Sequence, residues 1–303
     1  MVGGLINLSV LSKLNMYGIR VTDIASQYWC EKQMELRHIY VEKVKRTKEM
    51  QEGEMLHQEL EEEANIQIEL EPKNYADYIY KSLYMGYLGM KNLPKNKHTR
   101  EVQVYGAMGA FRLSGKIDEI RMKDDELYIY EDKTRQKDEL PNGSQKRTHM
   151  VQLLVYRKMI DDIRSGAYGT EQFKRDYTTR TLRMTPEFTR QFDELGIDRD
   201  LQSIDSMSES FFGTLIGAKG VSDVLQVRYI NQFTKKEIGT YKFDYDANEA
   251  KDITEFVLKY WNGAREAMPV PEDEKWKCRY CSFFGKECKA WWPQKGIGGE
   301  GAK

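Results

Sequence analysis

Several features that would assign a chain of 303 residues to a special class are missing from this sequence. Cysteine occurs only four times, too rarely for the disulfide framework of a small secreted domain. No stretch approaches the roughly 18–20 consecutive apolar residues that cross a membrane. The 47 lysine and arginine residues nearly balance the 48 aspartate and glutamate residues, so no overall positive charge attracts nucleic acid. Any site for a polyanion must therefore be a local groove.

The remaining composition is that of an ordinary globular protein, with 40% hydrophobic and 31% charged residues. The length suits one large or two modest domains, and we predict a single domain over residues 1–292 with a tail at residues 293–303. The first twenty residues contain no acidic side chain, yet we interpret them as an irregular start of the domain and not as a mitochondrial presequence. We expect an intracellular monomer that binds no membrane, located in the nucleus or mitochondrion if eukaryotic and otherwise in the cytoplasm.

The segment at residues 127–133 has the strict alternation of a half-buried strand. One face carries Leu127, Ile129, Glu131 and Lys133. The other face carries Tyr128, Tyr130 and Asp132. The first face begins with aliphatic residues and ends with a carboxylate and an ammonium group. Because an unpaired buried charge is costly, Glu131 and Lys133 require a cleft, a metal ion or each other.

A preceding strand carries Asp118 near its end, and a polar Asp-Asp-Glu turn joins the two strands. Asp118 and Glu131 can then converge as oxygen ligands for a divalent cation, with Lys133 beside them to stabilise charge on a phosphate. This arrangement is typical of a metal-dependent phosphodiesterase. The alternative is an ion pair between Glu131 and Lys133, with Asp118 as a solvated strand end.

The four cysteines lie at the two ends of the chain. Cys30 is alone near the start, whereas Cys278, Cys281 and Cys288 form a C-x₂-C-x₆-C run. This spacing lets several thiolates reach one metal centre, either zinc or an iron–sulfur cluster, which the spacing alone does not separate. Such a centre would join the termini and stabilise the fold by restricting the unfolded chain. Four unrelated buried thiols are the alternative.

Four further polar residues are candidates for the central site. Gly53 and His57 share one face of a predicted helix over residues 41–66, so the glycine would let the helix approach the sheet and direct His57 to the carboxylates. Gln152 and Tyr156 are one turn apart on a later helix and are suited to orienting the site, although both could be satisfied interior groups. Glu101, where we expect the sheet to begin, is a candidate of second rank.

Residues 165–200 combine basic and aromatic side chains, a composition that can form a track for single-stranded nucleic acid. A charged, solvated surface is the interpretation we favour. A second hairpin is predicted over residues 223–245, and a helix through Trp261 leads to the cysteines. Near the start, Thr22 or Asp23 is the expected cap of a helix that runs through Cys30.

Taken together, these segments resemble the PD-(D/E)XK nuclease superfamily and, within it, the exonuclease V family. The resemblance spans about residues 19–292 and rests, in chain order, on VTDIASQYWCE, EGEMLH, REVQVYG, GKIDEI, EDKTR, QLLVYR and EKWKCRYCSFFGKEC. Each motif is loose by itself, but their combination in one chain is specific. The related nuclease of CRISPR adaptation shares these motifs in a shorter chain, and the long stretch between Tyr156 and Cys278 favours exonuclease V.

The resemblance implies an α/β fold with a restriction-endonuclease-like core sheet flanked by helices. An iron–sulfur lobe, formed by Cys30 and residues 270–292, would join the two termini. The implied activity is hydrolysis of single-stranded DNA by a Mg²⁺- or Mn²⁺-dependent exonuclease of 5′-to-3′ direction in DNA repair or maintenance, with a single-strand-binding protein as a further partner. A DNA-binding iron–sulfur module that does not cut is the other interpretation, and the intact catalytic motif speaks against it.

Roles follow from the resemblance residue by residue. Asp118 and Glu131 would hold the metal with the help of His57, and Lys133 would position water or stabilise the transition state. Gln152 and Tyr156 would order the site. A 4Fe–4S cluster would be bound by Cys30, Cys278, Cys281 and Cys288. One departure is the six residues between the last two cysteines, where the family usually has five, an insertion that a bulge in the loop can absorb.

Overall fold

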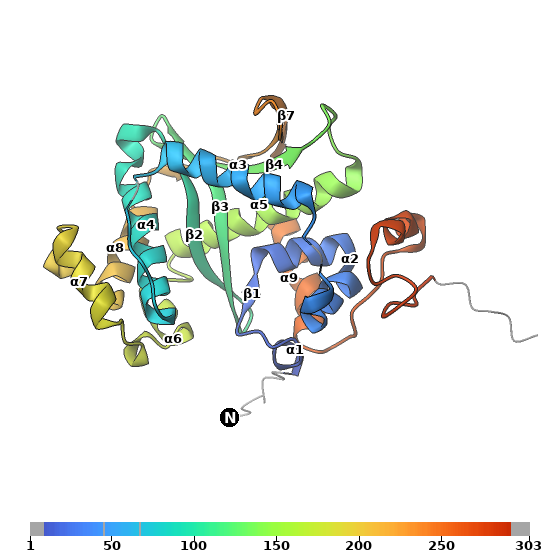
Figure 1. Ribbon diagram of the computed structural model, residues 1–303, viewed down its shortest axis with the longest axis horizontal. Helices are drawn as coiled ribbons and strands as arrows, with labels where there is room; N and C mark the ends of the chain where they lie inside the picture. Colours follow the sequence, from blue (N-terminus) through green and yellow to red (C-terminus); the bar gives the residue numbers. More distant parts are fainter. Residues whose placement is uncertain (1–8, 45, 67, 292–303) are drawn as a thin grey trace, which may run out of the picture.

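The computed structural model describes residues 9–44, 46–66 and 68–291 (Figure 1). Its centre is a mixed seven-stranded sheet in the order β1-β3-β4-β6-β7, in which β2 also pairs with β3 and β5 with β4. The strands are β1 (Ile19–Arg20), β2 (His98–Met108), β3 (Phe111–Lys123), β4 (Glu126–Arg135), β5 (Gly220–Val221), β6 (Val224–Asn231) and β7 (Glu237–Asp244). The predicted α/β class is confirmed.

Both predicted hairpins are present, joining β3 to β4 and β6 to β7 as antiparallel pairs. The first turn places Asp124 and Asp125 in the left-handed region, at φ values of 51° and 63°, as the favoured two-residue hairpin turns require. In contrast, β4 runs parallel to β6, so the chain between them must cross over the sheet. The sheet begins earlier than predicted, with β1 and with β2 from His98, and not at Glu101.

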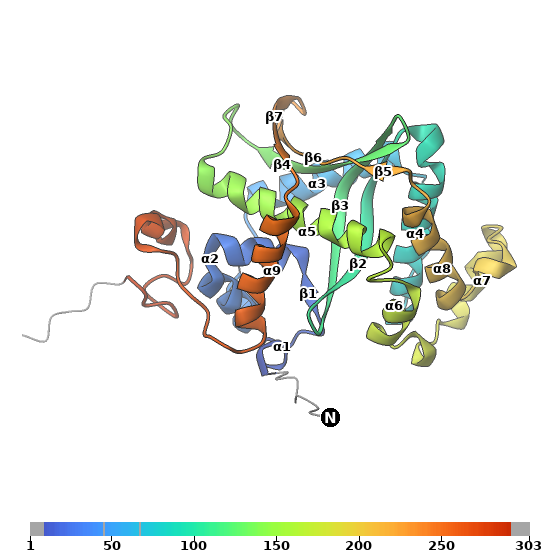
Figure 2. The ribbon, with the colours of Figure 1, turned by 180° about the vertical axis from the view of Figure 1, so that it is seen from behind.

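Helices cover both faces of the sheet. In Figure 1, α3 (Lys48–Ala64) crosses in front of β2 and β3, and α4 (Tyr75–Asn96) lies alongside; Figure 2 shows α5 (Gly143–Arg164) across the opposite face. Around α5 pack α2 (Val21–Ile39), α8 (Ile204–Ile216) and α9 (Ala247–Trp261). The shorter elements are α1 (Ser9–Lys13), α6 (Thr170–Asp176), α7 (Pro186–Glu194), and four 3₁₀ helices, Val41–Lys43, Thr179–Thr181, Arg199–Leu201 and Glu272–Tyr280. None of the described helices is long and apolar enough to cross a membrane.

The helix starts have identifiable caps. The side chains of Thr47, Asn74 and Asn142 accept backbone N–H groups at the starts of α3, α4 and α5. The predicted cap of α2 is wrong: the helix starts at Val21, and Asp23 lies in its first turn, where it accepts the N–H of Arg20 at 3.0 Å. The carboxylate reaches back from inside the helix instead of preceding it.

The aromatic residues of the 165–200 segment belong to the hydrophobic core. Tyr168, Phe173 and Tyr177 are each at most 5% exposed. Phe173 and Tyr177 pack against Tyr105 of β2, and Tyr168 packs against Phe212 of α8. Buried rings cannot stack on bases, so this segment is not an aromatic track for a single strand. Its arginines remain on the surface, in agreement with the solvated face that we favoured.

Candidate functional site

The site lies where β3 and β4 separate. The two strands pair from Lys123↔Glu126 up to Glu119↔Tyr130, after which β4 continues beside β6. Asp118 is the next residue of β3, in the middle of that strand and not near its end as we had predicted. Its carboxylate Oδ2 accepts a hydrogen bond of 2.7 Å from the backbone N–H of Asp132, across the opening between the strands. This bond fixes the carboxylate at the fork.

Glu101 joins Asp118 from the other side. The flanking pairs Arg100↔Glu119 and Val102↔Ile117 place Glu101 directly opposite Asp118, and Glu101 has a left-handed φ of 53°. Such a backbone conformation is uncommon for a residue with a side chain and is often found at functional sites. The sequence ranked Glu101 second, and the structure places it at the centre.

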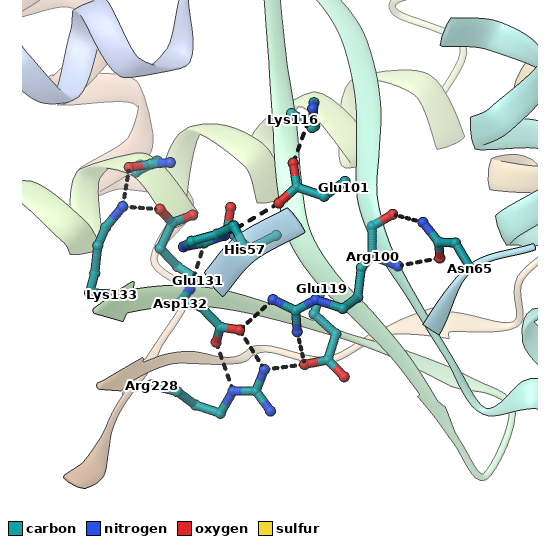
Figure 3. A network of polar contacts seen from close by, with 12 residues as sticks. His57, Asn65, Arg100, Glu101, Lys116, Glu119, Glu131, Asp132, Lys133 and Arg228 are labelled. Atoms are coloured by element: carbon teal, nitrogen blue, oxygen red, sulfur yellow. Dashed lines mark hydrogen bonds and ion pairs between the residues drawn. The ribbon is translucent and has the colours of Figure 1, made fainter. Parts of the chain in front are cut away.

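His57 completes a group of three. One ligand atom from each of His57, Glu101 and Asp118 lies within 4.8 Å of the others, the single such group of three or more His, Cys, Asp or Glu residues in the described part of the chain. The His57 ring nitrogen Nδ1 lies 3.3 Å from Glu101 Oε1, and Lys116 Nζ lies 3.1 Å from Glu101 Oε2 (Figure 3). Nitrogen and carboxylate oxygen at this spacing can hold a divalent cation.

The predicted close approach of α3 to the sheet is present and depends on Gly53. A Cβ at this position would lie 2.7 Å from Thr134 Oγ1 on β4, closer than side chains pack. The same hydroxyl accepts from Gln232 Nε2 at 3.0 Å, and this amide also donates to the Glu49 carbonyl of α3. The glycine therefore lets α3 settle on β4, with His57 one turn further along, facing the carboxylates.

Glu131 and Lys133 form an ion pair, as the alternative interpretation expected. One carboxylate oxygen of Glu131, however, takes no part in this pair. Lys133 Nζ bonds Glu131 Oε1 and lies 3.4 Å from Gln152 Oε1. Glu131 is fully buried, and its Oε2 has no hydrogen-bond partner in the described structure. A buried carboxylate oxygen without a partner is costly, and a cation would satisfy it.

Burial and charge shift the pKa values of these groups. Burial, together with the nearby Asp118 charge, raises the pKa of Glu131 to about 8 against the opposing effect of Lys133. Burial also raises the pKa of Asp118. For Glu101, burial alone would raise the pKa, but the hydrogen bond with His57 and the charge of Lys116 hold it below the ordinary value. Two protonatable carboxyl groups close together are therefore poised to exchange protons for a metal ion.

Gln152 and Tyr156 contribute differently. Gln152 reaches Lys133, as described above, whereas the Tyr156 hydroxyl donates to the Lys116 carbonyl at 2.7 Å and accepts from its N–H at 3.2 Å. Tyr156 thus holds the backbone of β3 two residues before Asp118. The hydrogen bonds of both side chains support the site from α5, beneath the sheet.

The carboxylates open into a groove of roughly 1,070 Å³. Helix α3 forms one wall, and residues of β2, β3 and β4 form the floor. Besides Gly53 and His57, the residues that line it include Arg46, Glu54, Lys81, Glu101, Lys116, Asp118 and Lys133. A groove of this size and mixed charge can hold part of a polymeric substrate.

The four cysteines converge although they are far apart in the chain. Together they line a small cavity between α2 and the C-terminal segment. Cys30 lies at a break in α2, where φ of −167° and ψ of 108° interrupt the helix. Burial raises the pKa of the Cys30 and Cys278 thiols. Although all four cysteines are described, no three of their sulfurs lie within 4.8 Å of one another.

The longer spacing before the last cysteine is accommodated by a tight return of the chain. The N–H of Cys288 donates to the Phe283 carbonyl at 3.0 Å, and the N–H of Gly285 donates to the Cys288 carbonyl at 2.9 Å. Gly285 has a φ of 76°, a conformation that glycine adopts without strain. This turn brings Cys288 to the cavity that the other three cysteines line.

The cysteine lobe is fastened to the rest of the domain by a buried lysine. Lys277 Nζ lies 4.2 Å above the centre of the Trp29 ring and donates to Glu274 Oε2 at 2.6 Å. Glu274 in turn accepts from the Ser144 hydroxyl at the start of α5, the helix that carries Gln152. The lobe is thus connected to the helix beneath the catalytic candidates.

A second charged cluster was missed from the sequence. Arg100 and Arg228 both bond Glu119 and Asp132, with contacts to Asp132 of 2.6 and 2.8 Å (Figure 3). All four residues are buried or nearly so. A signal did exist: Asp132 alternates to the face opposite Glu131, and Arg228 is the one charged residue of a largely apolar strand. Their pairing depends on the parallel register Asp132↔Arg228, which the sequence does not reveal.

The comparison with known proteins covers most of the chain. The family model described as exonuclease V, a 5′ deoxyribonuclease, matches residues 8–126, 121–213 and 199–292. Exonuclease V of Danio rerio is 25% identical over 292 residues, an alignment that covers 91% of this chain and 71% of the fish protein.

Shorter similarities were also found. Mitochondrial exonuclease V of Debaryomyces hansenii is 32% identical over 80 residues, covering 26% of this chain and 12% of the fungal protein. That of Candida tropicalis is 33% identical over 75 residues, covering 25% of this chain and 11% of the fungal protein. A crystal structure of SSO0001 aligns with 93% of this chain and 96% of its own, at 15% identity and a TM-score of 0.43, too low to support an argument.

Proposed function

The chain belongs to the exonuclease V family, and from this premise we propose that it is a metal-dependent exonuclease that degrades single-stranded DNA from the 5′ end. The observation that carries the proposal is the convergence of His57, Glu101 and Asp118 beside the Glu131–Lys133 pair. This constellation lies at the fork of a mixed sheet and supports assignment of the core to the PD-(D/E)XK type.

The residues present fit a divalent cation. Glu131 offers a buried oxygen without a hydrogen-bond partner in the described structure, and Asp118 and Glu101 offer further carboxylate oxygens. These hard ligands suit Mg²⁺ or Mn²⁺, and His57 adds a nitrogen donor. When bound, the ion would lower the pKa of a water molecule and neutralise phosphate charge. We propose Asp118, Glu131, Glu101 and His57 as its protein neighbours.

The chain's own groups would complete the chemistry. Lys133 holds its ammonium between Glu131 and Gln152, with a side chain that is 29% exposed. From this position it can donate a hydrogen bond to a phosphate oxygen or to the attacking water. Glu101 keeps His57 oriented and also holds Lys116 at the edge of the groove. Tyr156 holds the β3 backbone at Lys116, two residues before Asp118.

We further propose that Cys30, Cys278, Cys281 and Cys288 hold a 4Fe–4S cluster. Four thiolates without a histidine around one cavity suit an iron–sulfur cluster or zinc, and the 4Fe–4S cluster is the centre that the family resemblance implies. Its role would be structural, because the lobe contacts the nuclease core through Lys277, Glu274 and Ser144.

The family also suggests the partners and the cellular location of this protein. The proposed activity suits DNA repair or maintenance inside the cell by a monomer, working on strands that a single-strand-binding protein exposes or presents. The relatives in fungi carry the word mitochondrial in their names, and for this chain a nuclear, mitochondrial or cytoplasmic location is a proposal.

Digestion of end-labelled single strands tests the function. With Mg²⁺ present, we expect degradation of linear single strands, resistance of circular strands and of strands blocked at the 5′ end, and little cleavage of duplex. Omission of the divalent cation should abolish the activity. Equal degradation of 5′-blocked strands would overturn the polarity, and binding without cleavage in any divalent cation would leave a DNA-binding module.

A further inference from the structure

A second groove leads into the metal site along the face of β1, β2 and β3. We propose that this face binds the single strand on one side of the bond that is cut, with base stacking on Tyr75 and Tyr78 and phosphate contacts to Arg20, Arg112 and Lys116. The inference rests on the proposed nuclease function and locates its substrate. Apart from Lys116, which lines both grooves, none of these residues belongs to the metal site or the cysteine lobe.

Strand alternation lines up the polar side chains. Arg112, Ser114, Lys116 and Asp118 are alternate residues of β3 and therefore share one face. Six residues of extended strand cover roughly 20 Å, so this row runs from the metal site to the far end of the sheet. The parallel pair Arg20↔Ser114 adds Arg20 of β1 to the same face.

The face is hollowed along this row. A groove of roughly 350 Å³ has Arg20, Arg112, Ser114 and Lys116 among its lining residues, and Lys116 also lines the larger groove over the carboxylates. The two grooves therefore meet at Lys116, whose ammonium lies 3.1 Å from Glu101 Oε2. Figure 1 shows β2 and β3, which both contribute residues to the lining of this groove, descending from beneath α3 between α4 and α2.

Two tyrosines are exposed beside the groove. Tyr75 and Tyr78, in the first turn of α4, line it with side chains that are 48% and 52% exposed. An unpaired base offers a flat apolar surface that these two neighbouring rings can cover. The exposed rings contrast with the buried aromatics of the 165–200 segment.

Cationic groups are available for phosphates. Arg20 is 60% exposed although it pairs with the buried Asp23, and Lys116 is 48% exposed. The Arg112 guanidinium lies 4.8 Å above the Tyr177 ring and donates to the Asp176 carbonyl at 3.3 Å, which holds it at the edge of the groove. Exposed rings interleaved with cations are the composition that binds single strands without reading their sequence.

The affinity for a fluorescent 20-nucleotide oligothymidine strand, measured without divalent cation, tests the proposal independently of cleavage. Replacing both tyrosines, Tyr75→Ala with Tyr78→Ala, should weaken binding at least about fivefold, the lower limit for loss of one base stack. The double variant Tyr75→Phe with Tyr78→Phe should bind like wild type, because the rings remain. A 2-aminopurine base in the oligonucleotide should be quenched by wild type and the Phe variant, and less by the Ala variant.

Controls separate this proposal from the function on which it rests. Arg190→Ala, at an exposed position of α7 that lines neither groove, should leave binding unchanged, and near-ultraviolet circular dichroism should show that every variant is folded. A folded Ala variant with the affinity and quenching of wild type would overturn the binding track even if wild type cuts DNA. Wild type that binds but never cuts would overturn the nuclease and leave the track standing.

Discussion

The Asp118 carboxylate accepts a hydrogen bond of 2.7 Å from the Asp132 backbone N–H, although the strands that carry the two residues have already stopped pairing. The Asp118 side chain thus replaces a missing backbone hydrogen bond between the two strands. The opening that results receives His57 from α3 and Glu101 from β2. The unpaired stretch of sheet is therefore the reason that several charged groups can meet at one point.

Asp118→Ala should lower cleavage in Mg²⁺ at least about a hundredfold, because a metal-binding carboxylate is lost. Affinity for single strands should stay near that of wild type, since removing an anion does not weaken attraction for phosphate. Initial rates with a labelled oligonucleotide and binding without divalent cation measure the two effects. Asp125→Asn, in the exposed β3–β4 turn, is the control; cleavage by Asp118→Ala at the wild-type rate would show that the site assignment is wrong.

Lys133→Ala should reduce kcat by about 100- to 1,000-fold, the usual cost of losing one donor to transition-state charge. Binding should change little, because one phosphate contact among many contributes little to affinity. Single-turnover rates at saturating enzyme separate the two quantities. A variant that keeps its turnover at saturation but binds weakly would make Lys133 a docking residue.

Glu101→Gln should raise the Mg²⁺ concentration needed for half-maximal activity, because a negative charge is removed from the group with His57 and Asp118. The His57 pKa should fall, since burial by itself favours the neutral ring and the hydrogen bond with Glu101 contributes to raising the pKa. Mg²⁺ titration of activity and NMR titration of His57 measure the two. Glu59→Gln, exposed on α3, should change neither, and an unaltered Mg²⁺ requirement in Glu101→Gln would remove Glu101 from the site.

Cys281→Ser should bleach the protein, increase its sensitivity to proteolysis and reduce DNA binding together with activity. The cause is loss of a ligand from a centre that joins Cys30 to the C-terminal segment. Visible absorbance, metal analysis and limited trypsin digestion of anaerobically purified protein check this, and Asp118→Ala should keep its colour. Colourless wild type with stoichiometric zinc would exclude the cluster, and a fully active, fully folded Cys281→Ser would exclude the structural role.

Arg228→Met should lower the free energy of unfolding by about 3–5 kcal/mol at pH 7, because it leaves buried Glu119 and Asp132 underpaired. Burial alone would raise the Asp132 pKa, but the hydrogen bonds and charge of Arg228, with the charge of Arg100, hold it below the ordinary value. This pairing stabilises the fold above the unfolded pKa of about 4 and is lost as pH falls through the depressed folded pKa.

The difference in free energy of unfolding between Arg228→Met and wild type should therefore become smaller as the pH is lowered. Urea unfolding at pH 7 and at several lower pH values measures it. The matched change Arg190→Met removes an exposed pair with Glu187 and should cost less than about 1 kcal/mol. A difference for Arg228→Met that stays constant from pH 7 to the acid limit would contradict the ion-pair explanation.

Several features of this protein were determined by local sequence patterns. The alternation over residues 127–133 identified a strand whose buried face includes Glu131, and the paired apolar runs identified both hairpins. Gly53 and His57 were placed correctly on one face of a helix, and the spacing of the cysteines indicated a common centre. Such patterns work because periods of two and of 3.6 residues act within a single element.

Tertiary structure decided which residues meet. The sequence ranked Glu101 second because its position opposite Asp118 depends on strand register, and it missed the pairing of Arg228 with Asp132 for the same reason. Burial was also decided at this level: Tyr168 and Phe173 fill the core, whereas Tyr75 and Tyr78 remain exposed beside the groove. The amino-acid sequence alone does not distinguish the buried aromatic residues from the exposed ones. The packing of elements that are distant in the chain determines whether each ring contacts protein or solvent.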